Sequence, residues 1–356
     1  MSFFSNLFQS KFPLVGVDIS DSSIELLQLK TNKELKTCSR EKIPAKLMKN
    51  SEIKDLDKLA GVLKKAYQAA SPGFSSQSCL LSLPDKQSFF WVFDLKPNEA
   101  DLDKRILKVA QGKLPLDLKT CYYDYLVTDL ANGKKEVFFV AAEKNIIDQY
   151  IKLFEQADLN LEVIDFESAC LARALLTEED KKEAGFIVDL GAEVTDIVLT
   201  DQKGFRDQIN IPLAGDALTQ KIAEHLKIEP EKAEKIKKEQ GVLIKEKDCQ
   251  TIILDFFENF FSDIYKMQEN YQDKTNKQVK KIYLVGGSSL LKGIKELFAE
   301  NLNDLEVVLG QPDKKINLSN KKLPANKIYY TNVIGLALRG LNKNTLEQGI
   351  NLVEDY

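Results

Sequence analysis

The sequence predicts an α/β protein built from two related halves, with a smaller module inserted into the first half. Strand patterns alternate with amphipathic helical patterns along the 356 residues, and one pattern occurs twice, 171 residues apart. The two copies are FPLVGVDISDSSIELLQL around Asp18 and GFIVDLGAEVTDIVLT around Asp189. Each copy contains an apolar strand, an aspartate, a turn of small residues and a second apolar strand. The two halves therefore share a starting hairpin.

The first half begins with a meander of three strands, LVGVDIS, SIELLQLK and KTCSREKIP, separated by polar turns. Apolar residues then recur at helical spacing over 56–70, and SCLLSLP at 78–84 returns to a strand. Residues 1–84 are therefore expected to form most of the first lobe. The aromatic start, MSFFSNLFQSKF, is interpreted as a docked or frayed terminus rather than a membrane-touching amphipath.

Residues 85–168 follow a different order and predict an inserted β-α-β-β-α-β module. An Asn cap opens the first helix of this module, and Asn132-Gly133 marks the turn between its two middle strands. The chain is then expected to return to the first lobe over 169–184. The expected elements of the module lie at 89–95, 98–114, 122–130, 135–143, 144–157 and 160–168.

The second lobe is expected over 185–330. It begins with the second aspartate hairpin and continues with three helices, of which the third is long and has one apolar face. The aromatic residues of that helix have the spacing of a buried core face. A helix at 331–341 closes the first lobe within 331–345, and residues 346–356 form a tail. The helices are expected at 215–226, 230–240 and 251–271, and a strand, a turn and a helix at 280–302.

Composition excludes several classes of protein. The chain has 50 Lys and Arg against 54 Asp and Glu, a net charge of −4, without the basic excess of a general nucleic-acid binder. Five scattered cysteines and one histidine give neither a zinc spacing nor a disulfide framework. P-loop and Rossmann glycine patterns are absent from the sequence. No apolar run approaches the length of a membrane span and no signal-peptide pattern is present, so a cytoplasmic location is expected.

The two aspartate turns carry the predicted chemistry. Small residues let a phosphate approach the backbone N–H groups, and an aspartate can hold a hydrated magnesium ion. Each turn alone is also compatible with an ordinary β-turn whose polar residues serve only turn geometry. The residues concerned are Asp18, Ser20, Ser22 and Ser23 in the first turn and Asp189, Gly191, Ala192 and Thr195 in the second.

A strand, Gly286-Gly287 and a helix in KKIYLVGGSSLLKGI form a third motif. Glycines here allow close approach of a ribose or adenine, and the start of a helix favours an anion. Two related aspartate hairpins followed by this motif resemble the actin-like ATPase fold of actin, sugar kinases and FtsA, a two-lobed, duplicated ribonuclease H-like fold. In that family the three motifs are phosphate-1, phosphate-2 and the adenosine motif.

The position of the inserted module makes the resemblance more specific. Its place between the two hairpins is that of subdomain 1C in FtsA and in the PilM family of type IV pilus assembly proteins. The sequence resembles the PilM family over nearly its whole length. The matching segments are PLVGVDISDSSIELLQL, FIVDLGAEVTDI, IPLAGDALTQKIAEHLKI followed by AEKIKKEQG, YLVGGSSLLKGIKELF and NVIGLALRGL.

The resemblance implies an ATP or ADP site with magnesium. Phosphate contacts are implied for the two aspartate turns, with Asp18 and Asp189 holding the ion through water. Ribose and adenine contacts are implied for Gly215, Glu234, Lys237, Gly286, Gly287 and Ser288.

The sequence departs from the actin-like pattern at two places. Ser20 stands where a glycine is usual, so the phosphate approach is expected to be looser. For water activation, the stretch 165–175 offers only Asp165, Glu167 and Ser168, and Glu167 is also interpretable as a helix cap. No catalytic residue is assigned, and weak or absent ATPase activity is expected.

The resemblance also implies a partner. Members of this family are cytoplasmic scaffolds that bind the N-terminal peptide of the membrane protein PilN, which typically begins with an Ile-Asn-Leu-Leu-Pro-like sequence. Such a scaffold is peripheral to the inner membrane. This chain itself carries Gly349-Ile350-Asn351-Leu352-Val353 near its end. One hypothesis is that this tail imitates the partner and fills the same groove, in its own subunit or through self-association in a neighbour's. The other is that it is a disordered end.

Two other functions share the fold. A small-molecule kinase needs a catalytic aspartate in a substrate cleft. An FtsA-like division protein polymerises on the membrane through a basic amphipathic C-terminal helix, whereas LNKNTLEQGINLVEDY is acidic at its end. The scaffold function is preferred, with indirect membrane attachment and no nucleic-acid partner.

Overall fold

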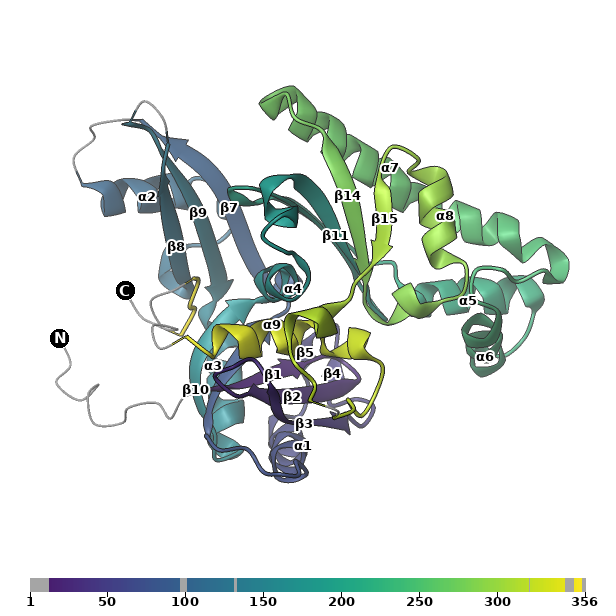
Figure 1. Cartoon of the computed structure of the whole chain (residues 1–356), viewed down its shortest axis with the longest axis horizontal. Coiled ribbons are helices and arrows are strands. Elements are labelled where there is room, and N and C mark those ends of the chain that lie inside the picture. The colour runs from purple at the N-terminus through teal and green to yellow at the C-terminus, as the bar shows by residue number, and fades with distance from the viewer. Residues whose placement is uncertain (1–12, 97–100, 131–132, 320, 343–348, 354–356) are drawn as a thin grey trace. The chain divides into compact units, whose positions relative to one another are not determined.

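The computed structural model describes residues 13–96, 101–130, 133–319, 321–342 and 349–353. The chain divides into two compact units (Figure 1). Unit 1 consists of Met1–Ala174 and Pro312–Tyr356, and unit 2 of Leu175–Gln311. The expectations for the aromatic start, the Asn98 cap, Asn132 and most of the tail lie outside the described residues.

Unit 1 contains a five-stranded sheet with the order β10-β6-β1-β2-β3. The expected meander is present, because β1, β2 and β3 pair antiparallel in sequence order. The other two strands run parallel, with β6 paired to β1 and β10 paired to β6. Strand β10 is therefore an edge of this sheet. The strands are β1 (Val15–Ile19), β2 (Ser23–Leu29), β3 (Leu35–Lys42), β6 (Ser78–Leu83) and β10 (Asn160–Phe166).

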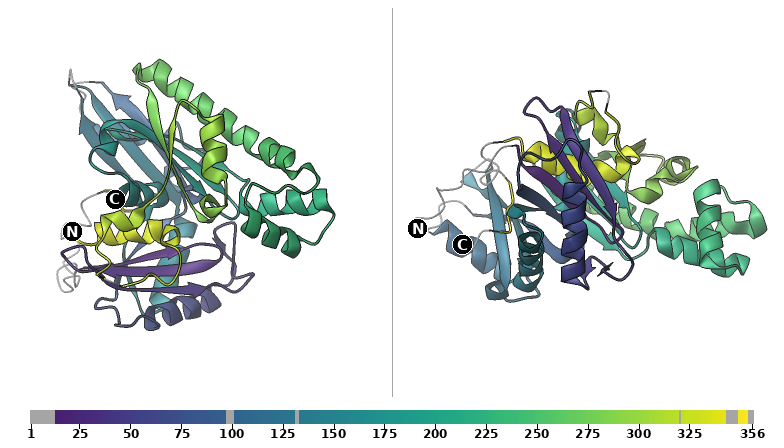
Figure 2. Two further views of the ribbon diagram at one scale, coloured as in Figure 1. Left: turned by 45° about the vertical axis from the view of Figure 1, so that its right-hand side comes forward. Right: turned by 90° about the horizontal axis from the view of Figure 1, so that it is seen from below.

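Helices cover both faces of this sheet, with α1 and α9 on opposite sides (Figure 2). Helix α9 is apolar nearly all round and packs on β1, β2 and β6. Two glycines let it pack closely. A Cβ on Gly16 would lie 2.9 Å from Leu336 Cβ, and a Cβ on Gly335 would clash with the backbone of Cys170. The helices are α1 (Leu56–Gln68), α3 (Lys144–Gln156), α4 (Glu167–Leu175) and α9 (Thr331–Arg339).

A second, three-stranded sheet of unit 1 has the order β7-β9-β8, and its core is formed with α2. It corresponds to the expected inserted module, with one difference. The last strand of that module, β10, pairs with β6 of the larger sheet, where its Val163–Phe166 half is buried. The elements are β7 (Ser88–Leu95), α2 (Leu102–Gln111), β8 (Cys121–Asp129) and β9 (Lys135–Glu143), and a short hairpin, β4 (Met48–Lys49) and β5 (Glu52–Ile53), precedes them.

Unit 2 repeats the topology of the larger sheet. Its strand order is β13-β12-β11-β14-β15, with an antiparallel meander β11-β12-β13 and parallel β14 and β15. Asp18 pairs with Glu25 in the first hairpin, and Asp189 pairs with Asp196 in the second. This shared register confirms the internal repeat. The strands are β11 (Ala184–Leu190), β12 (Thr195–Asp201), β13 (Gly204–Ile211), β14 (Val279–Val285) and β15 (Glu306–Leu309).

The core of unit 2 contains the aromatic face of its long helix. Phe257 and Phe261 of that helix pack edge-on against Phe298, with ring centroids 5.7 and 5.2 Å apart. The expectation that these aromatics form core is confirmed, because all four phenylalanines of the helix are buried. The helices are α5 (Gly215–Leu226), α6 (Pro230–Gln240), α7 (Cys249–Thr275) and α8 (Ile294–Asn301).

Three expectations need correction. Residues 175–184, which were expected to return to the first lobe, belong to unit 2. Residues 312–330 belong to unit 1 rather than to the second lobe, because Asn317 bridges to Glu34 beside β3. The Gly-Gly turn is followed by a short 3₁₀ segment, Gly287–Leu290, and the α-helix begins only at Ile294. Gly287 therefore does not start an α-helix.

All five cysteines are free thiols, four of them buried. Among the described residues, no helix is long and apolar enough to span a bilayer.

Candidate nucleotide-binding residues

Asp18 lies near the end of β1 and is surrounded by neutral polar groups. Its Oδ1 accepts a hydrogen bond from Ser82 Oγ at 2.7 Å, and a second bond comes from Asn332. Burial raises the pKa of Asp18 above its ordinary value, and these hydrogen bonds oppose the rise. Asn332 also donates its Nδ2 to Glu167 Oε1 at 2.6 Å. Asn332 thus joins the two carboxylates.

Asn332 carries a buried acceptor that lacks a hydrogen-bond partner within the described structure, its Oδ1. Leaving such an atom unpaired is unfavourable. A donor such as a water bound to magnesium would satisfy it. Carboxylate and amide oxygens are also the atom types that suit a hydrated magnesium ion. The residues around Asp18 therefore fit the implied ion.

The turn that follows Asp18 is closed by its own serine. Ser20 Oγ accepts the main-chain N–H of Ser22 at 3.4 Å and that of Ser23 at 3.1 Å. Ser20 N–H in turn donates to the carbonyl of Ser23 at 3.0 Å. These N–H groups are the ones expected to meet a phosphate. A phosphate oxygen would have to replace the Ser20 hydroxyl as their acceptor.

The hydroxyl of Ser23 links the first turn to Glu25 and Arg40. It donates to Glu25 Oε1 at 2.8 Å and accepts from Arg40 Nη2 at 3.1 Å. Arg40 Nε also pairs with Glu25, at 2.5 Å. Ser23 Oγ also lies 3.4 Å from Ser20 Oγ, so Ser23 joins the turn to a buried network.

In unit 2, Gly286 lies directly against the second aspartate hairpin. Its φ of +79° is left-handed, and an added Cβ would clash with Asp189 Oδ1 and lie 2.6 Å from Leu190 O. Only glycine fits at this position. The structure thus brings the predicted phosphate-2 and adenosine motifs together.

The turn after Asp189 is tied to the start of α5. Gly215 N–H donates to Gly191 O at 3.1 Å, and Asp216 N–H donates to Ala192 O at 2.8 Å. Ser288 Oγ also donates to Gly191 O, at 3.2 Å. Thr195 is fully buried, and its hydroxyl donates to Leu213 O at 3.0 Å. Gly191, Ala192 and Thr195 therefore hold the turn in place in this structure.

Lys237 joins α6 to α5. Its buried Nζ lies 2.6 Å from Gly215 O, from Thr219 Oγ1 and from Glu234 Oε2. Partial burial alone would raise the pKa of Glu234, but hydrogen bonds from Lys237, Thr219 and Lys238 lower it to about 2. Thr219 was not expected here, and neither were Ser82 and Asn332 in unit 1. All three are single polar residues without a motif.

The predicted residues of unit 2 enclose little free space. Thr195, Gly215 and Ser288 line an apolar pocket of about 10 Å³ together with phenylalanines of α7. This volume is at the lower limit for one water molecule. A ribose or adenine does not fit into this pocket.

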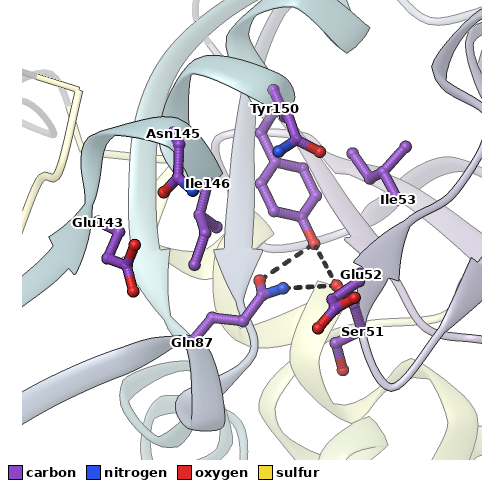
Figure 3. Close-up of a pocket in the computed structure, with 9 residues that line it drawn as sticks. Ser51, Glu52, Ile53, Gln87, Glu143, Asn145, Ile146 and Tyr150 are labelled. Carbon is purple, nitrogen blue, oxygen red and sulfur yellow. Dashed lines mark hydrogen bonds between the residues drawn. The ribbon is translucent and has the colours of Figure 1, made fainter.

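A larger hollow of about 320 Å³ lies in unit 1 beside the first turn (Figure 3). Ser51 on its wall donates its N–H to Asp21 Oδ1 in that turn at 2.9 Å. Gln87 Nε2 donates to Ser51 O at 2.5 Å, and Tyr150 points its hydroxyl toward the same oxygen (Figure 3). The sequence offered no motif for this hollow.

The three candidates for water activation are all engaged. Asp165 pairs with Arg173 at 2.9 Å and with Arg339 at 2.8 Å. Burial alone would raise the pKa of Asp165, but the two arginines hold it below its ordinary value. Ser168 donates to Asp85, and Glu167, the first residue of α4, accepts from Asn332.

Comparisons with known proteins define the class. The fold is that of the actin-like ATPases. The structure is similar to a chain of a PilM-PilN type IV pilus biogenesis complex, with a TM-score of 0.79 at 19% identity, covering 93% of this chain and 99% of the other. It is also similar to MreB5 of Spiroplasma citri bound to ADP, with a TM-score of 0.56 at 12% identity, covering 94% and 98%.

Sequence comparisons identify the family. The family model for the type IV pilus assembly protein PilM matches residues 16–341, so the chain belongs to this family. A more distant relative is the cell division protein FtsA of Pseudomonas aeruginosa, 24% identical over 95% of this chain and 91% of that protein. The expected membership is confirmed.

Proposed function

We propose that this protein is an ATP-binding cytoplasmic scaffold of the type IV pilus assembly machinery. It binds the N-terminal peptide of a PilN-like inner-membrane protein and is held at the membrane by that partner. The observation that carries the proposal is the match to the PilM family over residues 16–341. The similarity to a PilM-PilN complex over 93% of the chain supports the choice of partner.

Nucleotide binding uses the two repeated hairpins. Asp18 and Asp189 hold magnesium through water, and Ser20, Ser22 and Ser23, with Gly191, Ala192 and Thr195, shape the phosphate turns. Gly215, Glu234, Lys237, Gly286, Gly287 and Ser288 form the nucleoside side. The shared register of the hairpins and the similarity to an ADP-bound MreB5 support this assignment.

Hydrolysis is weak or absent. Asp165 is bound by two arginines, Ser168 by Asp85 and Glu167 by Asn332. A general base must reach its water within hydrogen-bond distance, with its acceptor available. The engagement of all three groups supports a role as a binding scaffold.

Calorimetry with MgATP tests the nucleotide site. The full chain is expected to bind MgATP, whereas Asp18→Ala and Asp189→Ala lose binding. Asp57→Ala, at an exposed position on α1, serves as the matched control and retains it. Unchanged affinity in both site variants would overturn the assignment.

The partner is tested with a labelled N-terminal peptide of the PilN-like protein. Binding to the full chain or to a chain truncated after residue 348 supports the proposal. If neither binds, the proposed partner is wrong.

The similarity to FtsA supports a second function, filament formation at a membrane. Sedimentation of the full chain with MgATP and lipid vesicles tests it. Nucleotide-dependent pelleting without any partner would favour this function over the scaffold.

A further inference from the structure

Residues 349–353 of the tail are inserted into unit 1. Ile350, Asn351 and Leu352 are 1%, 2% and 0% exposed, as deeply buried as the central strands. The segment runs beside β10 and β8 (Figure 1). Residues 349–353, Gly-Ile-Asn-Leu-Val, belong to no helix or strand. The segment lies in a slot formed by the edge of β10 at residues 162–164, by Asp124 and by Arg339. We call this the tail slot.

The tail pairs with the free edge of β10. Leu352 N–H donates to Ile164 O at 3.0 Å, and Asn351 Oδ1 accepts Ile164 N–H at 3.1 Å. Asn351 Nδ2 also lies 3.4 Å from Glu162 O. Edge strands leave such N–H and C=O groups open to an added peptide. The Asn351 amide therefore takes the place of a main-chain peptide group in an added strand.

Two charged side chains hold the tail from other elements. Asp124 on β8 accepts the N–H of Asn351 at 2.8 Å. Arg339 at the end of α9 donates to Ile350 O at 2.6 Å while it pairs with Asp165. Hydrogen bonds to charged groups are the stronger ones. The slot thus recognises both the C=O and the N–H of the peptide group that joins Ile350 to Asn351.

These contacts define a sequence preference. The amide of Asn351 is needed as acceptor and donor at once, which an alanine or aspartate cannot supply. Ile350 and Leu352 on its two sides are wholly buried, which requires apolar side chains. A ligand of the tail slot is therefore a peptide with an aliphatic residue, an asparagine and an aliphatic residue in succession.

We propose that the tail is an exchangeable plug. The tail slot binds aliphatic-Asn-aliphatic peptides supplied by another protein, and the chain's own residues 349–353 occupy it until such a peptide displaces them. The identity of that other protein as the PilN-like partner rests on the proposed function. Because the plug is tethered, its effective concentration is on the order of millimolar, and it weakens binding of an outside peptide without any new contact.

Fluorescence anisotropy tests the plug with a synthetic, labelled peptide of residues 349–356. The chain truncated after residue 348 is expected to bind this probe at least about tenfold more tightly than the full chain. A probe with alanine at the position of Asn351 is expected to bind the truncated chain about tenfold more weakly. Equal affinity of the truncated and full chains for the first probe would overturn the proposal.

A point variant covers the case in which truncation prevents folding. Full-length Asn351→Ala keeps the tail but weakens its docking, so it is expected to bind the probe more tightly than the wild type. Asn160→Ala, an exposed asparagine on the same strand β10, is the matched control and behaves as wild type. An Asn351→Ala chain that folds and binds no better than Asn160→Ala would also overturn the proposal.

The N-terminal peptide of the PilN-like protein separates the plug from the proposed function. Displacement of the labelled tail probe by this peptide, with tighter binding to the truncated chain, supports both. If the peptide binds neither chain while the tail probe binds the truncated chain, the proposed PilN-like partner is wrong and the proposal that the tail is exchangeable is supported. A full chain that is dimeric and becomes monomeric on truncation would show exchange between copies and overturn occupation within one chain.

Discussion

Ser20 Oγ accepts the main-chain N–H of Ser23 at 3.1 Å, so the first aspartate turn is closed by its own side chain. A glycine at this position would leave the N–H groups of Ser22 and Ser23 open to a phosphate. Ser20→Gly is therefore expected to tighten MgATP binding about fivefold, the value of one neutral hydrogen bond of about 1 kcal/mol. Titration calorimetry measures the change. Asp57→Ala, at an exposed position on α1, is the control, and equal or weaker affinity of Ser20→Gly would contradict the prediction.

Gly286→Ala is expected to destabilise unit 2 and to abolish nucleotide binding. The left-handed backbone at Gly286 and the closeness of Leu190 O leave no room for a methyl group. Strain of this kind is worth about 1–3 kcal/mol. Urea unfolding measures the loss.

Gly61→Ala in α1 is the control, because there an added methyl group has room. A Cβ there meets nothing within 4 Å, so stability should rise by about 0.5–1 kcal/mol. If Gly286→Ala unfolds like the wild type, the close approach to Asp189 is wrong.

Arg339→Met is expected to lower the free energy of unfolding by about 3–5 kcal/mol, because it leaves the carboxylate of Asp165 buried with one arginine fewer. It also removes the donor to Ile350 O, so the tail should be released. Lys64→Met breaks the exposed pair with Asp158 and should change stability by at most about 1 kcal/mol. Thermal unfolding compares the two variants. Similar small losses would show that the buried ion cluster contributes little.

Much of the fold was predictable because local patterns determine it. The Asp18 and Asp189 hairpins are contiguous segments whose apolar alternation reports their own strands, and their shared register follows from the repeat. The pairing of β10 with β6 was not predictable. Residues 160–166 have a strand pattern that would fit the three-stranded sheet as well as the five-stranded sheet. Their pairing with β6 depends on packing between segments far apart in the sequence.

The site was predictable in its motifs but not in its contacts. Asn332 lies in TNVIGLALR, and a polar residue in a helix that is otherwise buried was a usable signal for it. The closure of the Ser20 turn and the insertion of Asn351 depend on hydrogen-bond directions that composition and spacing do not encode.

Stability between pH 4.5 and 2 is expected to depend on Glu234. Hydrogen bonds from Lys237, Thr219 and Lys238 lower its pKa from 4.5 to about 2. Between these values the unfolded chain binds a proton that the folded chain does not. The stabilisation is therefore present above pH 4.5 and is lost as the pH falls toward 2. Because Glu234 is partly exposed, solvent screening limits the contribution to about 1 kcal/mol. Glu234→Gln should remove this part of the slope in urea unfolding measured across pH 5 to 3.

A variant on the same helix distinguishes this network from the general effect of lost charge. Glu239 pairs with Lys235 across 3.9 Å in solvent, and Glu239→Gln should keep the wild-type slope. If both variants flatten the slope equally, net charge rather than the Lys237 network sets the acid dependence. A flattened slope in Glu234→Gln alone, together with weaker MgATP binding, would place the Glu234–Lys237 pair in the nucleotide site as well as in the packing of α6 on α5.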